Sequence, residues 1–228
     1  MNTVTYPKDL ENSESLIIQL SAFKMAPIDV ITYSGKKQFS DKDYKGEPCG
    51  VIVMALPSAT LTESFSSSWN IDNIFEKVNS TAVAQTAQMF TSAMLPPVYK
   101  ATYSSTSPRS YSFTFSFLPK NREETEDVVK IIKMLKQWTA PGTLLGSNEG
   151  FDSSTMGRII PYVLEIKFRN GAEKLQELIK PLLCIIENIS VSYFDNGQIT
   201  AYYDGMPKST SVSLSVKEVT VPTRDDFN

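Results

Sequence analysis

The stretch YYDGMPKSTSVSLSVKEVTVPTRDDF, residues 202–227, decides the fold of this chain. Its middle alternates between small polar and apolar residues, which is typical of a β-strand with one buried face. The apolar side predicts contact with a hydrophobic core. The alternation breaks at Glu218, which predicts a β-bulge at that position. The other side of the strand is almost all serine, with Ser211, Ser213 and Ser215.

Other segments alternate in the same way or form short apolar runs rich in β-branched and aromatic residues. These segments predict strands over 16–23, 50–56, 60–69, 111–118, 159–168, 184–194, 199–203 and 209–221. A tight hairpin turn is predicted at 195–197, which reads Asp-Asn-Gly. Polar segments rich in Gly, Pro or Ser predict loops over 35–50, 103–110 and 142–157.

A helix is predicted over residues 121–138. Asn121 is a suitable N-cap, and Glu124 follows three residues later, as in a capping box. Acidic residues fill the first turns and lysines the later ones, an order that the helix dipole favours. The apolar stripe consists of Val128, Ile131, Ile132, Leu135 and Trp138. Apolar residues near helical spacing within 70–95 predict one or two amphipathic helices, and the segment 172–180 is a further candidate helix.

The order of these elements predicts an α+β fold. We expect a mostly antiparallel β-sandwich or half-open barrel, with the helix at about 121–138 on its flank. One domain is expected over 1–228, with an insertion at about 70–108. This insertion is expected either to pack on the core or to form an arm that contacts a partner.

Composition argues against catalysis. The chain has no histidine, which removes the commonest general base and most zinc sites. Cys49 and Cys184 lie far apart and form no CxxC pair, so we expect two free thiols, at least one of them buried. The sequence therefore indicates no enzyme, no catalytic residue, and no metal or cofactor site.

Charge and hydropathy restrict the partners. The net charge is −3, and lysine and arginine are scattered, so no basic stripe for nucleic acid is present. The first residues lack the features of a signal peptide, and no apolar run approaches the roughly 20 residues that span a bilayer. We expect synthesis in the cytoplasm and no membrane partner.

The serine side of the closing strand has two interpretations. It is either an ordinary solvated face or a surface that meets another protein closely, where large charged side chains would have to be desolvated. Ser190 and Ser192 on the preceding strand extend the same small polar surface. The charged end of the chain is either an exposed terminus or a latch to a neighbouring subunit. Its candidate contact residues are Arg224, Asp225, Asp226 and Phe227.

Four stretches of the sequence resemble the tail-tube family of contractile-tailed bacteriophages. They are YPKDL (6–10), MALPSATLTESFSSSW (54–69), YSFTFSFLPKNREETEDVVKIIKMLKQWTAP (111–141) and the closing stretch from Ile189 to Phe227. Within this family, the stretches are similar in particular to the baseplate proteins that cap the hub and initiate the tube. Residues 70–108 have no counterpart in it.

This resemblance implies a two-sheet, barrel-like tube fold that assembles into a hexameric ring around a lumen through which DNA passes. The ring is expected in the virion, between the central hub and the tail tube, after synthesis in the host cytoplasm. The implied partners are the neighbouring tail-tube and hub ring proteins, the wedge proteins outside the ring and the tape-measure protein inside it. The implied activity is templating of the first tube ring.

Other functions remain open on the sequence. A tube-body or hub ring protein of the same fold has the same features. A carbohydrate-binding β-sandwich needs exposed aromatic side chains, for which Trp69, Tyr202 and Tyr203 are candidates. A hydrolase that uses a pair of carboxylates is a third class.

Overall fold

The structure of the chain is a computed structural model. It describes residues 2–10, 16–25, 45–56, 61–73, 99–143, 158–169, 176–177, 179–193, 201–202 and 205–227. The chain divides into two compact units. The larger unit is Met1–Ser64 with Pro108–Asn228, and the smaller one is Phe65–Ser107. The smaller unit covers most of the predicted insertion at 70–108 but begins at Phe65.

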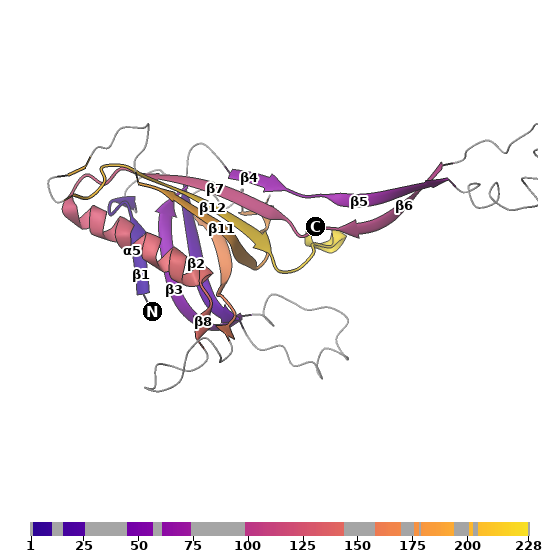
Figure 1. The fold of residues 1–228 in the computed structure, drawn as a ribbon, viewed down its shortest axis with the longest axis horizontal. Helices are drawn as coiled ribbons and strands as arrows, with labels where there is room; N and C mark the ends of the chain where they lie inside the picture. Colours follow the sequence, from indigo (N-terminus) through magenta and orange to yellow (C-terminus); the bar gives the residue numbers. More distant parts are fainter. Residues whose placement is uncertain are drawn as a thin grey trace, which may run out of the picture. The chain divides into compact units, whose positions relative to one another are not determined.

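The larger unit is built on an eight-stranded mixed sheet (Figure 1). Its strands in chain order are β1 (Asn2–Tyr6), β2 (Ile17–Met25), β3 (Lys45–Ala55), β4 (Leu61–Ser64), β7 (Ser110–Phe117), β10 (Val163–Arg169), β11 (Cys184–Ser192) and β12 (Thr210–Glu218). Their order across the sheet is β1-β3-β2-β10-β11-β12-β7-β4. Only β1 and β3 run parallel, and every other pair is antiparallel. The predicted α+β class with mostly antiparallel strands is therefore confirmed.

The sheet curls so that its two margins meet at one end. Tyr6 ends the edge strand β1, and its hydroxyl accepts a hydrogen bond of 3.0 Å from the backbone N–H of Leu118, just after β7. The ring of Tyr6 also packs edge-on against Phe117, with 5.0 Å between ring centroids. Because β7 lies next to the other edge of the sheet, these contacts join strands from opposite margins.

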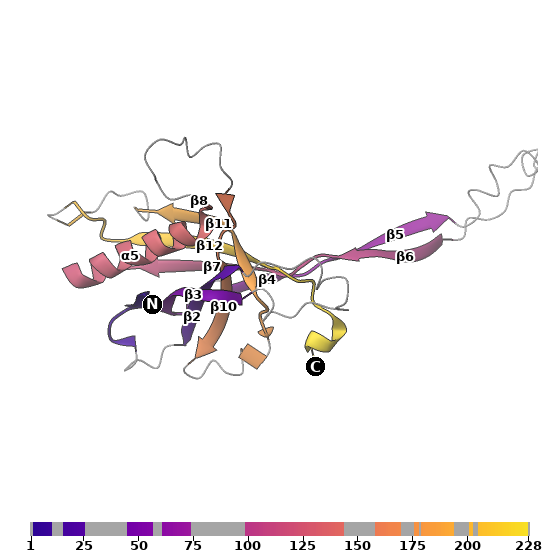
Figure 2. The same ribbon diagram turned by 90° about the horizontal axis from the view of Figure 1, so that it is seen from below.

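The long helix α5 (Arg122–Thr139) lies on one face of the sheet and contacts β1 and β11 (Figures 1 and 2). Its sequence-predicted stripe is buried, as expected from helical spacing. Gly50 on β3 permits the close approach, because a Cβ there would lie 2.9 Å from the Met134 methyl carbon. The core behind α5 includes Ile18, Leu20, Ile52, Met54, Phe113, Phe115, Phe117, Leu164, Ile166, Val212, Leu214 and Val216. We call the side of the sheet that these residues occupy the inner face.

The predicted β-bulge at Glu218 is wrong. Glu218 continues the alternation of β12 and is buried on the inner face, in phase with Val216. The irregularity lies instead in the partner strand β11, between Ile186 and Asn188. A charge can take an inner position here because a buried arginine pairs with it, as described below.

Three short elements complete the described fold. β8 (Gly142–Thr143) and β9 (Arg158–Ile159) pair with each other, and η3 (Arg224–Phe227) is a single 3-10 turn after β12. The smaller unit consists, in its described part, of the strands β5 (Ser67–Asn73) and β6 (Tyr99–Thr106), which form an antiparallel two-stranded sheet.

Several predicted boundaries are wrong. Residues 45–50, predicted as loop, belong to β3, and most of the predicted loop at 103–110 belongs to β6 or β7. The predicted helix at 70–95 does not begin at Asn70, because residues 70–73 pair with β6; residues 74–95 lie outside the described residues.

Two predicted strands are interrupted. The strand expected at 60–69 ends at Ser64 and resumes at Ser67. The strand expected at 159–168 is divided between β9 and β10, and Pro161 lies in the break because it has no N–H to donate to a ladder. Strands are confirmed near the predicted segments 16–23, 50–56, 111–118, 184–194 and 209–221, although their ends differ by a few residues.

Some predictions fall mostly outside the described residues. Within 172–180, residues 176, 177 and 179 are helical. Within 199–203, Ala201 forms an isolated bridge with Pro207. The predicted turn at 195–197 and most of the predicted loop at 142–157 lie outside the described residues. Both cysteines are free, as predicted: Cys184 is buried and Cys49 half-buried.

Candidate subunit interface

The side of β12 opposite the core belongs to a surface of small polar side chains that crosses three adjacent strands. Ser213 is its centre: it lies opposite Thr114 on β7 and Ser190 on β11. Its hydroxyl oxygen is 3.3 Å from that of Thr114. We call this surface the hydroxyl face. It consists of Ser112, Thr114 and Ser116 on β7, Ser211, Ser213 and Ser215 on β12, and Asn188, Ser190 and Ser192 on β11.

None of these nine side chains carries a charge. The nearest ion pair along the strands joins Lys217 and Glu187, 3.2 Å apart, just beyond the last row of the face. Hydroxyl groups lose less solvation free energy than charged groups on burial, and they both donate and accept hydrogen bonds. Chemically, this surface suits close contact with another protein better than a long-range interaction with a charged ligand.

The described sheet has two edge strands. β4 lies at the edge beside the hydroxyl face, and β1 lies at the opposite edge, beyond β10, β2 and β3. β4 pairs only with residues 110–113 of β7. The second half of β7, from Thr114 on, is therefore not paired with β4. An edge strand presents backbone N–H and C=O groups to which a strand of another chain can add.

The structure does not place the predicted tail latch on the hydroxyl face. Arg224, Asp225, Asp226 and Phe227 form η3, which follows β12 after a short irregular stretch. Asp226 acts within its own turn: its Oδ2 accepts hydrogen bonds from the N–H of Thr223 (2.6 Å) and from the Thr223 hydroxyl (2.9 Å). The side chain of Arg224 is exposed, and those of Asp225 and Phe227 lie outside the described part of the structure.

A buried ion pair, which sequence reasoning missed, fixes one end of β12. Arg109 binds Glu218 in two places, with 2.9 Å between Nε and Oε2 and 2.7 Å between Nη2 and Oε1. Glu218 also accepts hydrogen bonds from the Tyr111 hydroxyl and from the N–H of Leu182, each 3.0 Å long. Both charged side chains are about 1% exposed or less.

The same arginine reaches two further segments. Its Nη1 donates to the carbonyl of Ile179 (2.8 Å) and its Nη2 to that of Lys180 (2.9 Å). Glu63 on β4 lies 3.5 Å from Nη1. The cluster thus holds together β4, β7, β12 and the segment before β11.

The pKa shifts in this cluster keep Arg109 charged and Tyr111 protonated, which are the forms that bind the Glu218 carboxylate. Burial lowers the pKa of the Arg109 guanidinium, but the hydrogen bonds and charge of Glu218 outweigh burial and raise it. Burial, followed by the charge of Glu218, raises the pKa of Tyr111 far above its usual range, so its hydroxyl stays protonated and donates to Glu218. We assign this cluster to the stability of the fold rather than to chemistry.

The two-stranded sheet of β5 and β6, which we call the ribbon, has one apolar side. Trp69 lies opposite Tyr103, and the two rings pack edge to face, with 5.5 Å between centroids. Ile71 and Tyr99 project on the same side, since strand residues two apart share a face. The opposite side is polar, with Asp72 opposite Lys100.

The other aromatic candidates for sugar binding are not arranged as a platform. The Tyr202 hydroxyl donates a 2.6 Å hydrogen bond to the carbonyl of Pro119, and Lys208 lies over the Tyr202 ring. Tyr203 lies outside the described residues. Trp69 belongs to the smaller unit and Tyr202 to the larger one.

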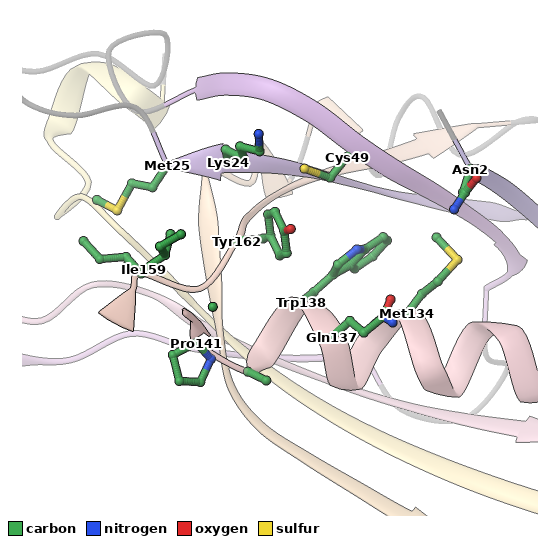
Figure 3. A pocket seen from close by; sticks show the side chains of 13 residues that line it. Asn2, Lys24, Met25, Cys49, Met134, Gln137, Trp138, Pro141, Ile159 and Tyr162 are labelled. Atoms are coloured by element: carbon green, nitrogen blue, oxygen red, sulfur yellow. The ribbon is translucent and has the colours of Figure 1, made fainter. Parts of the chain in front are cut away.

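A cavity of about 940 Å³ opens beside the C-terminal end of α5 (Figure 3). Its walls are mainly apolar, and Ile159 and Ile160, about half and two thirds exposed, lie at its margin. Its lining also includes Met25, Cys49, Met134, Trp138, Pro141 and Tyr162. Burial, and next to it the neighbouring Cys49, raise the pKa of Tyr162.

Within the described residues, no group of three or more His, Cys, Asp or Glu side chains is arranged to hold a metal ion. No helix in the same residues is both long and apolar enough to cross a membrane. No protein-family model matches the chain, and no curated protein matches it.

Proposed function

We propose that this chain is a structural protein of a contractile phage tail, with a tail-tube-like fold. Six copies form a ring in the baseplate that caps the hub and nucleates the tail tube around a DNA-passing lumen. The observation that carries the proposal is the hydroxyl face: an uncharged, small-residue surface that spans three strands of a curled sheet, with β1 and β4 as the edge strands of its described part.

A ring of identical subunits needs two different, complementary contact surfaces on each copy. The β1 edge and the β4–β7 edge supply two such surfaces, because each presents backbone groups to a neighbouring strand. Pairing of these edges between copies continues the sheet around the ring. The hydroxyl face then lies against a neighbour or toward the lumen, where small uncharged side chains avoid desolvating charges.

The proposed activity is templating, and it needs no catalytic residue, metal or cofactor. One side of the ring presents the geometry to which the first tube ring adds, and the other side rests on the hub ring. Wedge proteins contact it from outside and the tape-measure protein from inside. A tube-body or hub ring protein would differ from the proposed initiator ring only in its position along the tail.

A second candidate, carbohydrate binding, draws on the exposed Trp69, which is 58% exposed. Its ring packs edge to face against Tyr103, however, and Tyr202 is held by Pro119. Titration of the purified protein against a glycan array discriminates the two functions. Binding that is lost in Trp69→Ala favours the carbohydrate module, whereas ring formation without glycan binding favours the proposal.

The deciding experiment is cryo-electron microscopy of tails from a lysate that contains this protein, with the protein located in the density. Six copies in one ring between hub and tube support the proposal. Many stacked rings make the chain a tube-body protein. Absence from the particles overturns the proposal.

A substitution in the hydroxyl face tests the interface itself. Ser213→Arg places a long charged side chain at the centre of the face, so we expect folding to be retained and ring incorporation to be lost. Ser213→Ala is the matched control, because it keeps the surface small and uncharged. Incorporation of the Arg variant at the level of the Ala variant contradicts the proposed interface.

A further inference from the structure

The apolar side of the ribbon is exposed to an unusual degree. Trp69, Ile71, Tyr99 and Tyr103 are 58%, 70%, 67% and 52% exposed. An isolated two-stranded hairpin is at best marginally stable in water, and contiguous apolar surface of this kind marks an interaction site. The opposite side, with Asp72 and Lys100, is suited to solvent. The ribbon therefore has one side built to be covered.

The cavity beside α5 offers complementary chemistry. Its volume of about 940 Å³ lies at the upper end of the roughly 300–1,000 Å³ typical of ligand pockets. Met25 and Met134 supply flexible thioethers, which adapt to irregular shapes and contact aromatic rings favourably. The exposed Ile159 and Ile160 continue the apolar surface outward from the cavity.

The charge at the cavity disfavours a charged ligand. Lys24 is the one charged residue among those that line the cavity. Its ammonium group is 2.7 Å from Glu47, and this pairing raises the pKa of Lys24. Its charge is thus already matched within the chain. Asn2, Gln137 and Tyr162 add neutral polar groups to a lining that is otherwise mainly apolar, which suits an aromatic or aliphatic side chain.

A second copy of this chain is the occupant that these features favour. Each copy carries one apolar ribbon and one apolar cavity, so contact between successive copies covers each surface once. Such a contact is heterologous, and heterologous contacts close into rings or continue as filaments. In this contact, the ribbon supplies aromatic and aliphatic side chains, and the cavity supplies a lining that includes methionine, tryptophan and isoleucine.

We propose that the apolar side of the ribbon of one copy docks into the cavity beside α5 of the next copy. This inference rests on the self-association in the proposed function, but not on the position of the ring in a tail. It adds a side-chain contact to the edge-strand pairing, and it assigns the smaller unit a role that the sequence left open.

The cavity contains its own reporter, because Cys49 lines it and is only half-buried. The experiment mixes two full-length chains of different tag mass. The first carries Ile71→Cys on the apolar side of the ribbon together with Cys49→Ser. The second is unaltered, so its Cys49 is the accessible thiol, since Cys184 is fully buried. A short bis-maleimide then links thiols that lie close together.

The matched control places the new cysteine on the other side of the ribbon. Thr102→Cys, again with Cys49→Ser, lies opposite Asn70 on the polar side and is likewise exposed. We expect on the order of tenfold more mixed dimer from the Ile71→Cys chain, because docking raises the effective concentration of its thiol near Cys49. Peptide mapping must locate the link between residues 71 and 49.

Several results overturn the inference. Equal yields from the two cysteine positions, or no mixed dimer from either, show that the ribbon does not enter the cavity of another copy. A dominant link between the introduced thiols of two Ile71→Cys chains shows a symmetric ribbon–ribbon contact instead. In the Ile71→Cys chain that keeps Cys49, a link within one molecule shows that the ribbon covers its own cavity.

Complementation provides an independent test without a cross-linker. Ile71→Asp removes the ribbon's apolar side, and Ile160→Asp charges the margin of the cavity. Each variant alone retains only the strand edges for self-association, whereas the mixture also has one intact ribbon and one intact cavity, so we expect several-fold more pairs in the mixture than in either variant alone. Equal pairing in the mixture and in the single variants, or no pairs from the mixture, contradicts the proposal. Tail particles with a ring but without this contact leave the proposed function standing.

Discussion

Glu218 occupies a position on β12 that a hydrophobic side chain would ordinarily fill. Its carboxylate is compensated by the two bonds from Arg109 and by donors from Tyr111 and Leu182. A buried ion pair is costly to desolvate, and it is tolerated only when the remaining hydrogen-bonding capacity is satisfied. Among the described residues, no buried side-chain nitrogen or oxygen lacks a partner. The pair therefore specifies how β12 meets the segment before β11.

Glu218→Gln is expected to lower the free energy of unfolding by about 3 kcal/mol, because it leaves the charge of Arg109 buried without a full counter-charge. Urea denaturation followed by tryptophan fluorescence measures this loss. Glu63 remains 3.5 Å from the guanidinium and limits the effect.

The matched control is Glu187→Gln, which breaks the exposed pair with Lys217. An exposed pair contributes less than about 1 kcal/mol, so this variant should stay close to the unaltered chain. Equal losses in the two variants would contradict the structural role of the buried cluster.

Glu165 on β10 predicts a dependence of stability on pH. Burial tends to raise its pKa, but hydrogen bonds from Lys45 and Lys167 outweigh burial and hold the pKa below its ordinary value of 4.5. Folding therefore favours the ionised form. This contribution is fully present above the ordinary pKa and is lost as the pH falls through the lower folded value.

We expect the unaltered chain to lose more stability than Glu165→Gln on acidification from about pH 6 to about pH 3. The difference should stay below about 1 kcal/mol, because the side chain is partly exposed and screened by solvent. Urea midpoints measured across this range test the expectation. The same comparison in ~1 M salt is the control, since screening should reduce the difference. If the unaltered chain instead became more stable relative to Glu165→Gln on acidification, the sign would be contradicted.

At the scale of single elements, α5 shows a helix whose start the sequence determines. The Asn121 side chain accepts a 2.8 Å hydrogen bond from the N–H of Glu124, as predicted. The reciprocal bond differs from the usual capping box: Glu124 Oε2 accepts from the N–H of Lys120, one residue before the cap. Two otherwise unpaired donors at the start of the helix are thus satisfied.

Asn121→Ala is expected to destabilise the protein by about 1 kcal/mol, because it removes the capping acceptor. Thermal unfolding followed by far-ultraviolet circular dichroism would measure the change. Asn121→Asp is the control, since its carboxylate retains the acceptor and suits the helix dipole. A similar loss in both variants would show that capping is not the cause.

The elements that the sequence predicted well are those whose pattern is local. The apolar stripe of α5 and the alternation of β12 each lie within one continuous segment. The ion pair could not be predicted, because Arg109 lies 109 residues from Glu218 and a charge in a strand ordinarily indicates solvent. β1 was missed as well: its short polar segment becomes a strand only because β3 lies beside it in parallel.

The candidate site, too, was predicted only where its pattern lies within one continuous segment. The composition of the hydroxyl face was visible on β12 and β11, because alternation assigns Ser211, Ser213 and Ser215 to one side. The contribution of β7 depends on strand order, which periodicity does not encode. The ribbon was missed because residues 70–73 show no long alternation, and the strand with which they pair begins only at Tyr99, far along the chain.

On the scale of the whole molecule, the two units differ in what stabilises them. Every buried apolar side chain among the described residues belongs to the larger unit. The chain leaves that unit after Ser64 and returns at Pro108, and both points adjoin the buried cluster, since Glu63 and Arg109 are 3.5 Å apart. The ends of the insertion are therefore held close together without any contribution from the ribbon.

Replacement of residues 65–107 by a short Gly-Ser linker is accordingly expected to leave the larger unit folded. The core and the Arg109–Glu218 cluster remain, and loop closure over a shorter connection costs no more than about 1 kcal/mol. The replacement removes Trp69, so Trp138 is the one remaining tryptophan. Urea denaturation followed by its fluorescence measures the unfolding free energy of the larger unit. The same replacement should weaken the pairing of copies, since the docking side is gone and only the strand edges remain. A larger unit that unfolds would show that the ribbon stabilises its own chain. A deletion variant that still self-associates through the cavity would show that the cavity binds something other than the ribbon.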